Sequence, residues 1–292
     1  MRVLVLGATG LIGSAVVSEL VKHGHDVTGL ARSDASVAKV EALGAAALRG
    51  DITAPRAWAS AVGDMDGIVH AAATFDDDMG DTDAALIDAM EDAAREAGVR
   101  PRFLYTGGCW LYGATGDEVA TEERPFDPPS AFAFMIANAA RLLASPYFNA
   151  AVLHPATVYA ANGGEVADIV EQVKAGGPVE VWGGVETRWP LVHVSDLAAA
   201  YRLLLELGEL AGHFNVAAEE GVRIQSIIEA ACVRFGGACE IALRSVDDVI
   251  AENGSWAVGP TLDQQMSSGK LKAACGWVPG NTHFEKSDAF PL

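Results

Sequence analysis

Three glycines near the start of the chain have the spacing of an anion-binding turn. Gly7, Gly10 and Gly13 directly follow the apolar run Val3–Leu6 and open a stretch with helical periodicity. Glycine permits a tight turn, lets the backbone approach a phosphate closely and allows a helix to pack against a strand. The phosphates of a dinucleotide would then lie at a helix N-terminus, where free N–H groups and the helix dipole favour negative charge. We therefore predict that a dinucleotide cofactor is bound by Gly7, Thr9, Gly10, Leu11, Ile12 and Gly13.

The end of the second predicted strand indicates which dinucleotide is bound. A site selective for NAD usually places an acidic residue here, where it holds the ribose 2′-hydroxyl. This chain instead has Ala31, Arg32 and Ser33, and a guanidinium beside a hydroxyl could hold a 2′-phosphate. The pattern predicts NADP(H), and the alternative for Arg32 is a solvated side chain at the end of a strand. After the third and fourth predicted strands, we expect further cofactor contacts from Asp51, Ile52, Ala71, Ala72 and Ala73.

Three hydroxyl side chains are candidates for assisting a reaction at the carboxyl ends of the later strands, where parallel sheets bind ligands. Thr106 ends the fifth predicted strand, Tyr112 lies in the following loop, and Tyr159 follows the sixth strand. Each could donate a hydrogen bond or a proton to a substrate oxygen. The alternative for Thr106 is a hydroxyl satisfied by the backbone, and the alternative for Tyr112 is a phenol packed beneath the loop. We take the three as candidate catalytic residues.

The elements that must position these residues alternate between short β-rich runs and longer helical patterns over the first 160 residues. This alternation predicts a Rossmann-type, doubly wound parallel sheet with a smaller C-terminal substrate lobe. The strands are expected at Val3–Leu6, Asp26–Leu30, Ala46–Arg49, Gly67–Ala71, Arg102–Thr106 and Ala151–Leu153. The helices are expected at Ile12–His23, Ala35–Leu43, Pro55–Val62, Thr82–Ala97 and Ala131–Ala144. We expect residues 1–160 to bind the cofactor and residues 161–292 to form mainly the substrate lobe, with some segments returning to the sheet.

The composition favours a soluble enzyme-sized protein and argues against several classes of partner. Among the 292 residues, 50% are hydrophobic and the formal net charge is −19, which opposes binding to nucleic acid. No apolar run approaches the roughly 20 residues of a membrane span. The four cysteines, Cys109, Cys232, Cys239 and Cys275, lack the spacing of a metal site, so we expect no metal, free thiols and a cytoplasmic location.

Beyond the glycine turn, several short motifs resemble those of extended short-chain dehydrogenases/reductases, in the branch of epimerase/dehydratase-like and dihydroflavonol-reductase-like proteins. They are Gly50–Ile52, His70–Ala73, Leu111–Gly113, His154–Tyr159, Trp189–Asp196 and Cys275–Pro279. The resemblance implies cofactor contacts from Pro155, Thr157 and Val158. It also implies a homodimer, with the largely apolar helix at Ala131–Ala144 at its interface. Arg188 stands where some relatives hold an anionic part of the substrate, and the alternative is a surface ion pair.

The residues that catalyse the reaction in this family are missing from the chain. The family uses a Ser or Thr together with a Tyr-x-x-x-Lys pair, in which the ammonium lowers the pKa of the phenol. No tyrosine here has a lysine four residues later, and no lysine occurs between Lys39 and Lys174. By alignment from Tyr112, the three positions fall on Gly108, Phe132 and Ile136. This departure leaves the cofactor prediction intact and puts the usual reaction in doubt.

Three functions remain open on these observations. The first is an atypical NADP(H)-dependent oxidoreductase that acts on a small carbonyl or alcohol, with Tyr112 or Thr106 polarising the substrate oxygen. The second is a redox sensor or regulatory protein that binds NADP(H) without turnover. The third is a sugar-nucleotide epimerase or dehydratase, against which the missing Tyr–Lys pair speaks.

Overall fold

The computed structural model describes residues 1–236 and 239–290, which form two compact units. The first unit contains Met1–Gly107, Phe134–Leu153 and Leu197–Phe214, and the rest of the described chain makes up the second. This division does not follow the predicted boundary at residue 160. The stretch Gly108–Ala133 already belongs to the second unit, because the chain that leaves the fifth strand packs there rather than against the sheet.

The first unit is built on a seven-stranded sheet with the strand order β10-β6-β5-β4-β1-β2-β3. The strands are β1 (Arg2–Leu6), β2 (Asp26–Ala31), β3 (Ala46–Arg49), β4 (Gly67–His70), β5 (Arg102–Thr106), β6 (Asn149–Pro155) and β10 (Gly212–Val216). The neighbouring pairs from β3 to β6 are parallel. From β1 the chain adds β2 and β3 on one side of the sheet and then β4, β5 and β6 on the other. The boundary between β1 and β4 is therefore a topological switch point, where such sheets have a crevice for ligands. The predicted fold class and the six predicted strands are confirmed.

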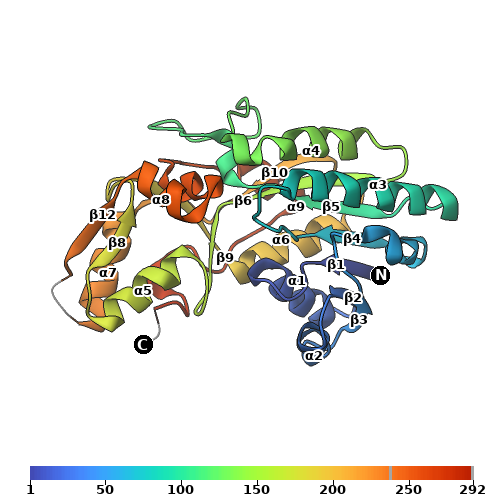
Figure 1. Cartoon of the computed structure of the whole chain (residues 1–292), viewed down its shortest axis with the longest axis horizontal. Helices are drawn as coiled ribbons and strands as arrows, with labels where there is room; N and C mark the ends of the chain where they lie inside the picture. The colour runs from blue at the N-terminus through green and yellow to red at the C-terminus, as the bar shows by residue number, and fades with distance from the viewer. Residues whose placement is uncertain (237–238, 291–292) are drawn as a thin grey trace. The chain divides into compact units, whose positions relative to one another are not determined.

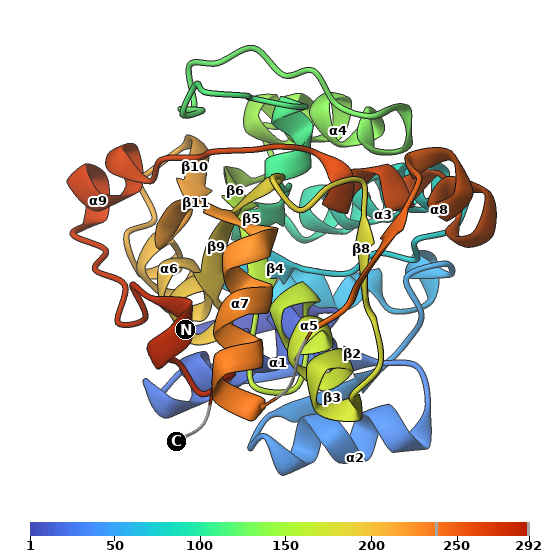
Figure 2. The ribbon, with the colours of Figure 1, turned by 90° about the vertical axis from the view of Figure 1, so that its left-hand side faces the viewer.

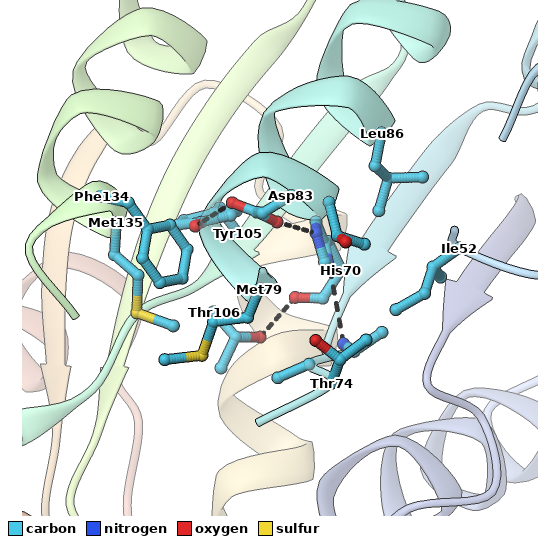
Figure 3. A pocket seen from close by; sticks show the side chains of 13 residues that line it. Ile52, His70, Thr74, Met79, Asp83, Leu86, Tyr105, Thr106, Phe134 and Met135 are labelled. Atoms are coloured by element: carbon cyan, nitrogen blue, oxygen red, sulfur yellow. Dashed lines mark hydrogen bonds and ion pairs between the residues drawn. The ribbon is translucent and has the colours of Figure 1, made fainter. Parts of the chain in front are cut away.

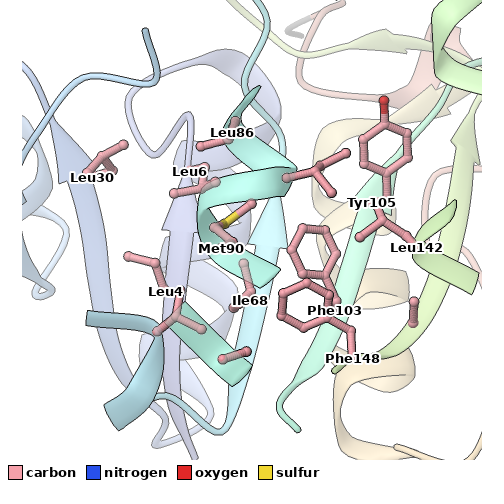
Figure 4. Packing of buried hydrophobic residues seen from close by; sticks show 14 of the residues in the cluster. Leu4, Leu6, Leu30, Ile68, Leu86, Met90, Phe103, Tyr105, Leu142 and Phe148 are labelled. Carbon is pink, nitrogen blue, oxygen red and sulfur yellow. The ribbon is translucent and has the colours of Figure 1, made fainter. Parts of the chain in front are cut away.

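Helices cover both faces of this sheet, because its strands are apolar on both sides. In Figure 1, α3 (Met79–Ala97) and α4 (Phe134–Ala144) lie over one face. The other face carries α1 (Leu11–Lys22), α2 (Asp34–Ala42) and most of α6 (Val194–Glu206). Under α3 and α4, the side chains of Leu4, Leu6, Ile68, Met90, Phe103 and Phe148 form a buried apolar cluster (Figure 4).

Two predicted helices differ from the structure. The segment at Pro55–Val62 forms two 3-10 turns, Pro55–Ala57 and Ala59–Asp64. Trp58, between them, has a non-helical φ of −135° and donates its indole N–H to the Asp51 carbonyl, so the α-helix is interrupted there. The predicted helix at Ala131–Ala144 begins with a 3-10 turn, Ser130–Phe132, and becomes α-helical only at Phe134.

The second unit contains two small sheets. One has the order β11-β9-β7 and the other pairs β12 with β8. The strands are β7 (Thr157–Tyr159), β8 (Val179–Trp182), β9 (Arg188–His193), β11 (Glu219–Arg223) and β12 (Ile241–Arg244). Helices α5 (Glu165–Ala175) and α7 (Ile224–Phe235) lie side by side, as Figures 1 and 2 show, and they share a buried cluster with Leu191 and Phe290. Helices α8 (Val246–Asn253) and α9 (Gly269–Cys275) complete the described part of this unit.

The cysteines correct one prediction. Cys232 and Cys239 form a disulfide with their Cα atoms 6.1 Å apart, whereas Cys109 and Cys275 are free. The spacing of the cysteines could not show this pairing, because it depends on where the chain returns after α7. Within residues 1–236 and 239–290, no cluster of three or more His, Cys, Asp or Glu side chains could hold a metal ion. None of the helices in the same residues is long and apolar enough to cross a membrane.

Candidate cofactor and active site

The glycine turn between β1 and α1 has a geometry that only glycine can adopt at two positions. Gly7 has φ of 78°, in the left-handed region, and a Cβ there would lie 2.3 Å from the Ala71 carbonyl oxygen. A Cβ on Gly13 would lie 2.0 Å from the Gly7 carbonyl oxygen. Because both neighbours are backbone atoms, no side-chain rearrangement could make room. The turn, the start of α1 and the end of β4 are therefore in close contact.

Gly10 differs from the other two glycines because the space above it is open. A Cβ at Gly10 would meet only the Gly7 carbonyl oxygen, at 3.4 Å. Helix α1 begins at Leu11, and Gly10 offers it no capping side chain. The N–H groups of Leu11 and Ile12 in the first turn of α1 are therefore available to an anion. This open cradle over a glycine at a helix N-terminus fits the pyrophosphate of a dinucleotide.

The end of β2 presents one free cation beside a structural serine. Ser33 is the N-cap of α2: its hydroxyl accepts a hydrogen bond from the Ser36 N–H at 3.2 Å, and Ser36 reciprocates at 2.9 Å. The Ser33 hydroxyl is thus already used in a capping box. Arg32 is exposed and makes no hydrogen bond or ion pair within the described residues. Of the predicted pair, Arg32 is the side chain that remains available for a 2′-phosphate.

Asp51 lies close enough to Arg32 for the guanidinium charge to lower the pKa of the carboxyl group. The N–H and hydroxyl of Thr53 both donate to Asp51 Oδ1, at 3.0 and 2.9 Å. These two bonds, followed by the charge of Arg32, outweigh burial and hold the pKa of Asp51 below its usual value. Asp51 is therefore a carboxylate at neutral pH. Its neighbour Ile52 lines a cavity together with Ala72 and Ala73, which brings three predicted cofactor residues together.

This cavity lies at the carboxyl ends of β4 and β5 and is shown in Figure 3. Its volume is about 20 Å³, which is room for about one water molecule. The polar side chains around it are His70, Thr74, Thr82, Asp83, Tyr105 and Thr106, and the apolar ones include Met79, Leu86, Phe134 and Met135. The cavity therefore combines hydrogen-bonding groups with apolar walls.

Thr106 is the predicted catalytic residue that reaches this cavity. Its hydroxyl donates to the His70 carbonyl oxygen at 2.6 Å and lies 2.5 Å from the Tyr201 hydroxyl. Because the single proton of Thr106 is used by His70, Tyr201 must be the donor to Thr106. Burial raises the pKa of Tyr201, so the phenol keeps its proton. Sequence reasoning missed Tyr201, since nothing local marks a residue of α6 as the partner of a residue on β5.

The other two predicted catalytic residues are buried in the interior of the second unit. Tyr112 is 1% exposed and donates its hydroxyl to Asn215 Oδ1 at 2.8 Å. Tyr159 is fully buried in β7 and packs edge-on against His193. Burial raises the pKa of both phenols. In this geometry neither hydroxyl is presented to a substrate, so the packing alternative describes Tyr112, and Tyr159 is likewise a buried residue of β7.

None of the three positions that carry the reaction in the family described above holds a residue capable of that chemistry here. A Cβ at Gly108 would meet nothing within 4 Å, and Phe132 is 3% exposed and packs against Trp110. Ile136 lies half-buried in α4. The predicted cofactor residue Pro155 ends β6, and Thr157 and Val158 form β7 in the second unit.

Three further residues singled out in the sequence have structural partners. Arg188 donates to both carboxylate oxygens of Asp263, at 2.9 and 2.6 Å, and to Asp117 at 3.1 Å. His193 lies 2.9 Å from Asp288 and 2.7 Å from Ser195. Burial raises the pKa of the Cys109 thiol to about 12, which makes it inert at neutral pH. The ion-pair alternative therefore describes Arg188.

Comparison with known proteins extends these observations. The chain is 29% identical to an uncharacterized protein of Saccharomyces cerevisiae, over 96% of the chain and 95% of that protein. It is 25% identical to the UDP-glucose 4-epimerase of Corynebacterium glutamicum, over 97% of the chain and 92% of the enzyme. The fold resembles the crystal structure of the Thermus thermophilus UDP-glucose 4-epimerase with NAD, with a TM-score of 0.81, 23% identity and coverage of 99% and 97%. It also resembles a Streptomyces venezuelae dTDP-glucose 4,6-dehydratase with NAD, with a TM-score of 0.81, 18% identity and coverage of 99% and 95%.

The family model of the NAD dependent epimerase/dehydratase family matches residues 3–217. This range contains the glycine turn, the switch point between β1 and β4, and Thr106 with Tyr201. The predicted resemblance to the extended short-chain dehydrogenases/reductases is thereby confirmed. The chain belongs to the NAD dependent epimerase/dehydratase family and has its NAD(P)-binding Rossmann fold.

Proposed function

We propose that the protein is an NADP(H)-dependent oxidoreductase that transfers a hydride to or from a small carbonyl or alcohol substrate. The observation that carries this proposal is the Thr106 hydroxyl, which stands at the carboxyl end of β5, lines a small cavity with polar and apolar walls and receives a hydrogen bond from Tyr201. It is the one predicted donor that the structure leaves half-exposed at the edge of the sheet where ligands bind.

The residues that would hold the cofactor belong to the first unit. The N–H groups of Leu11 and Ile12 would bind the pyrophosphate over Gly10, and Arg32 would pair with the 2′-phosphate. Arg32 supports the preference for NADP(H) because it is exposed and unpaired, and because β2 ends at Ala31 and is followed by Arg32 in place of an acidic ribose ligand. When bound, NADP(H) supplies or accepts the hydride.

Thr106 would act on the substrate oxygen. Its hydroxyl can turn from the His70 carbonyl toward the substrate and donate a hydrogen bond, while Tyr201 continues to donate to Thr106 Oγ1. A hydrogen bond received by a hydroxyl polarises its own O–H bond, so Tyr201 makes Thr106 a stronger donor. This donor would stabilise the negative charge that develops on the carbonyl oxygen as hydride adds to its carbon, and the resulting alkoxide would take its proton from solvent.

A small uncharged substrate is favoured over a sugar nucleotide by the state of Arg188. Its guanidinium is held by Asp263 on two atoms and by Asp117 on a third. A charge-assisted bidentate pair of this kind is costly to break, so Arg188 is not presented to a phosphate of the substrate. Together with the absent Tyr–Lys pair, this argues against an epimerase or dehydratase reaction on a sugar nucleotide.

A second candidate function is an NADP(H)-binding sensor without turnover. Gly108, Phe132 and Ile136 replace the residues that carry the reaction in the family, and Tyr112 is bonded to Asn215. The test is the consumption of NADPH by the purified protein with a panel of small aldehydes, ketones and quinones. Substrate-dependent consumption that is lost in Thr106→Val supports the oxidoreductase. Binding of NADPH without consumption for any member of the panel would favour the sensor.

We also propose a cytoplasmic homodimer that uses α4. Only Asn138, Ala139 and Leu142 of this helix are buried, so Phe134, Met135 and Ile136 keep partly exposed apolar surface that a second copy would cover. A dimeric mass by light scattering at micromolar concentration, reduced to the monomeric mass in Ile136→Glu, would support this interface. The Cys232–Cys239 disulfide speaks against the cytoplasmic location, because disulfides are rare in that compartment, and a pair of free thiols at these positions in the native protein would remove that objection.

A further inference from the structure

A buried carboxylate in α3 organises four elements of the first unit. Asp83 accepts a hydrogen bond from His70 Nε2 on β4 at 2.6 Å, through Oδ1. Its other oxygen, Oδ2, accepts from the Tyr105 hydroxyl on β5 at 2.6 Å and from Asn138 Nδ2 on α4 at 2.7 Å. Figure 3 shows Asp83 between His70 and Tyr105 at the wall of the cavity.

The Asp83 carboxylate is stable as an anion only because of these donors. Burial alone would raise its pKa, but the electrostatic attraction of His70 and the three hydrogen bonds outweigh burial and lower it. Asp83 and His70 are 8% and 3% exposed, so bulk solvent has little access to these bonds. A dry carboxylate with three partners is costly to disturb, because any lost donor leaves a buried charge unsatisfied.

Asp83 also determines which ring nitrogen of His70 carries the proton. The Ala72 N–H points at His70 Nδ1, with the two nitrogens 3.4 Å apart, so in the neutral imidazole Nδ1 is the acceptor. The proton then lies on Nε2, where it is donated to Asp83. The carboxylate has no donor of its own, so it selects this tautomer and leaves the Nδ1 lone pair facing Ala72.

The Ala71–Ala72 peptide connects this tautomer to the glycine turn. Ala71 donates its N–H to the Leu6 carbonyl at 3.1 Å, and its own carbonyl oxygen occupies the place that a Cβ on Gly7 would need. The peptide is thus packed against the turn on one side and hydrogen-bonded to His70 on the other. A tilt of the peptide would change the path of the turn, because the two are already in backbone contact.

We propose that Asp83 is a positioning residue for the cofactor. By fixing the Nε2–H tautomer of His70, it holds the Ala71–Ala72 peptide against Gly7 and so sets the shape of the phosphate cradle. This inference deepens the proposed function and rests on the proposed binding of NADP(H). Asp83 touches no cofactor atom in this account and acts only through His70 and the backbone.

The experiment compares Asp83→Asn with Tyr105→Phe. Two donors face Oδ2, so an asparagine at position 83 would direct its carbonyl toward Tyr105 and Asn138 and its NH₂ toward His70. His70 would then have to accept a hydrogen bond at Nε2 and carry its proton on Nδ1. The Nδ1–H and the Ala72 N–H would then face each other as two donors without an acceptor. We expect ¹⁵N NMR of the imidazole to show the change of tautomer and the NADPH dissociation constant to rise on the order of tenfold.

Tyr105→Phe is the matched control, since it removes one donor to the same carboxylate and leaves the His70 bond in place. It should lower thermal stability while keeping the tautomer and the dissociation constant of the wild type. If Asp83→Asn does not fold, the comparison of His70→Asn with His70→Gln replaces it. Asparagine retains an acceptor at the position of Nδ1 and glutamine does not, so His70→Asn should bind NADPH more tightly than His70→Gln.

The outcomes separate this inference from the function on which it rests. A wild-type protein that fails to bind NADPH would overturn the proposed function, whatever the tautomer shows. Tight NADPH binding by the wild type, with the tautomer and the dissociation constant both unchanged in Asp83→Asn, would overturn the positioning role alone. An equal loss of affinity in Asp83→Asn and Tyr105→Phe, or in both His70 variants, would show that the cluster only stabilises the fold. That result would also overturn the positioning role.

Discussion

The Thr106 hydroxyl lies 2.5 Å from the Tyr201 hydroxyl and 2.6 Å from the His70 carbonyl oxygen. The first contact joins β5 to α6 and the second joins β5 to β4. Because Thr106 gives its proton to a carbonyl, it can exchange that acceptor for a substrate oxygen without breaking its bond from Tyr201. In a chain without the Tyr–Lys pair of its family, this arrangement provides a hydroxyl donor at the ligand-binding edge of the sheet.

Substitution of Thr106 should therefore separate turnover from cofactor binding. Thr106→Val keeps the shape of the side chain and removes the hydroxyl, so we expect kcat to fall about 10²- to 10³-fold with an unchanged NADPH dissociation constant. Tyr201→Phe should lower kcat by a smaller factor, because Thr106 keeps its own proton. Tyr112→Phe should leave kcat unchanged, since its hydroxyl is bonded to Asn215. Steady-state kinetics on one identified carbonyl would test the order, and an unaltered kcat in Thr106→Val would remove Thr106 from the reaction.

Two neighbouring glycines should fail in different ways when replaced by alanine. Gly10→Ala has room for its Cβ and a compatible φ of −80°, so the protein should fold, while the methyl group occupies the cradle and weakens NADPH binding by about 1–3 kcal/mol. Gly13→Ala places its Cβ 2.0 Å from the Gly7 carbonyl oxygen and should lower the melting temperature itself. Gly208→Ala is the control, because a Cβ there meets nothing within 4 Å. Calorimetry with NADPH titration would distinguish the three, and full NADPH affinity in Gly10→Ala would exclude this cradle as the phosphate site.

Stability should depend on pH through Glu219 in the second unit. Burial raises the pKa of this carboxyl to about 7, while its Oε1 accepts the Phe284 N–H at 2.8 Å. Because the folded pKa lies above the usual value, the stabilising contribution is complete in acid and is lost as the pH rises through about 7. Glu219→Gln mimics the protonated form, so its melting temperature relative to the wild type should increase from pH 5 to pH 8. The exposed Glu220→Gln is the control, and a difference for Glu219→Gln that is the same at both pH values would refute the assignment.

The sequence predicted those parts of the molecule that depend on local patterns. Each strand of the parallel sheet from β1 to β6 was predicted to within two residues, because apolar runs bounded by turn residues need no knowledge of distant partners. The glycine turn was predicted for the same reason. By contrast, β9 and β11 of the second unit were not expected, since their pairing depends on how Arg188–His193 meets Glu219–Arg223.

The candidate site was predicted only in part because its hydrogen bonds join distant positions. Thr106 was a candidate, but its partner Tyr201 lies 95 residues away. Asp83 is separated from Asn138 by 55 residues, and no spacing rule connects them. Tyr112 and Tyr159 have the right residue type after the right strands, yet burial and packing within the second unit determine their roles. Residue type and loop position therefore identify candidates, whereas the tertiary hydrogen bonds decide among them.

The central claim is that the glycine turn and Arg32 bind NADP(H), and isothermal titration with NADPH and NADH tests it most directly. The account predicts that the wild type binds NADPH more tightly than NADH. It also predicts that Arg32→Ala weakens NADPH binding roughly 10- to 100-fold while leaving NADH binding unchanged, because only NADPH carries the 2′-phosphate. Equal dissociation constants for the two nucleotides in the wild type, or the same loss for both in Arg32→Ala, would contradict it.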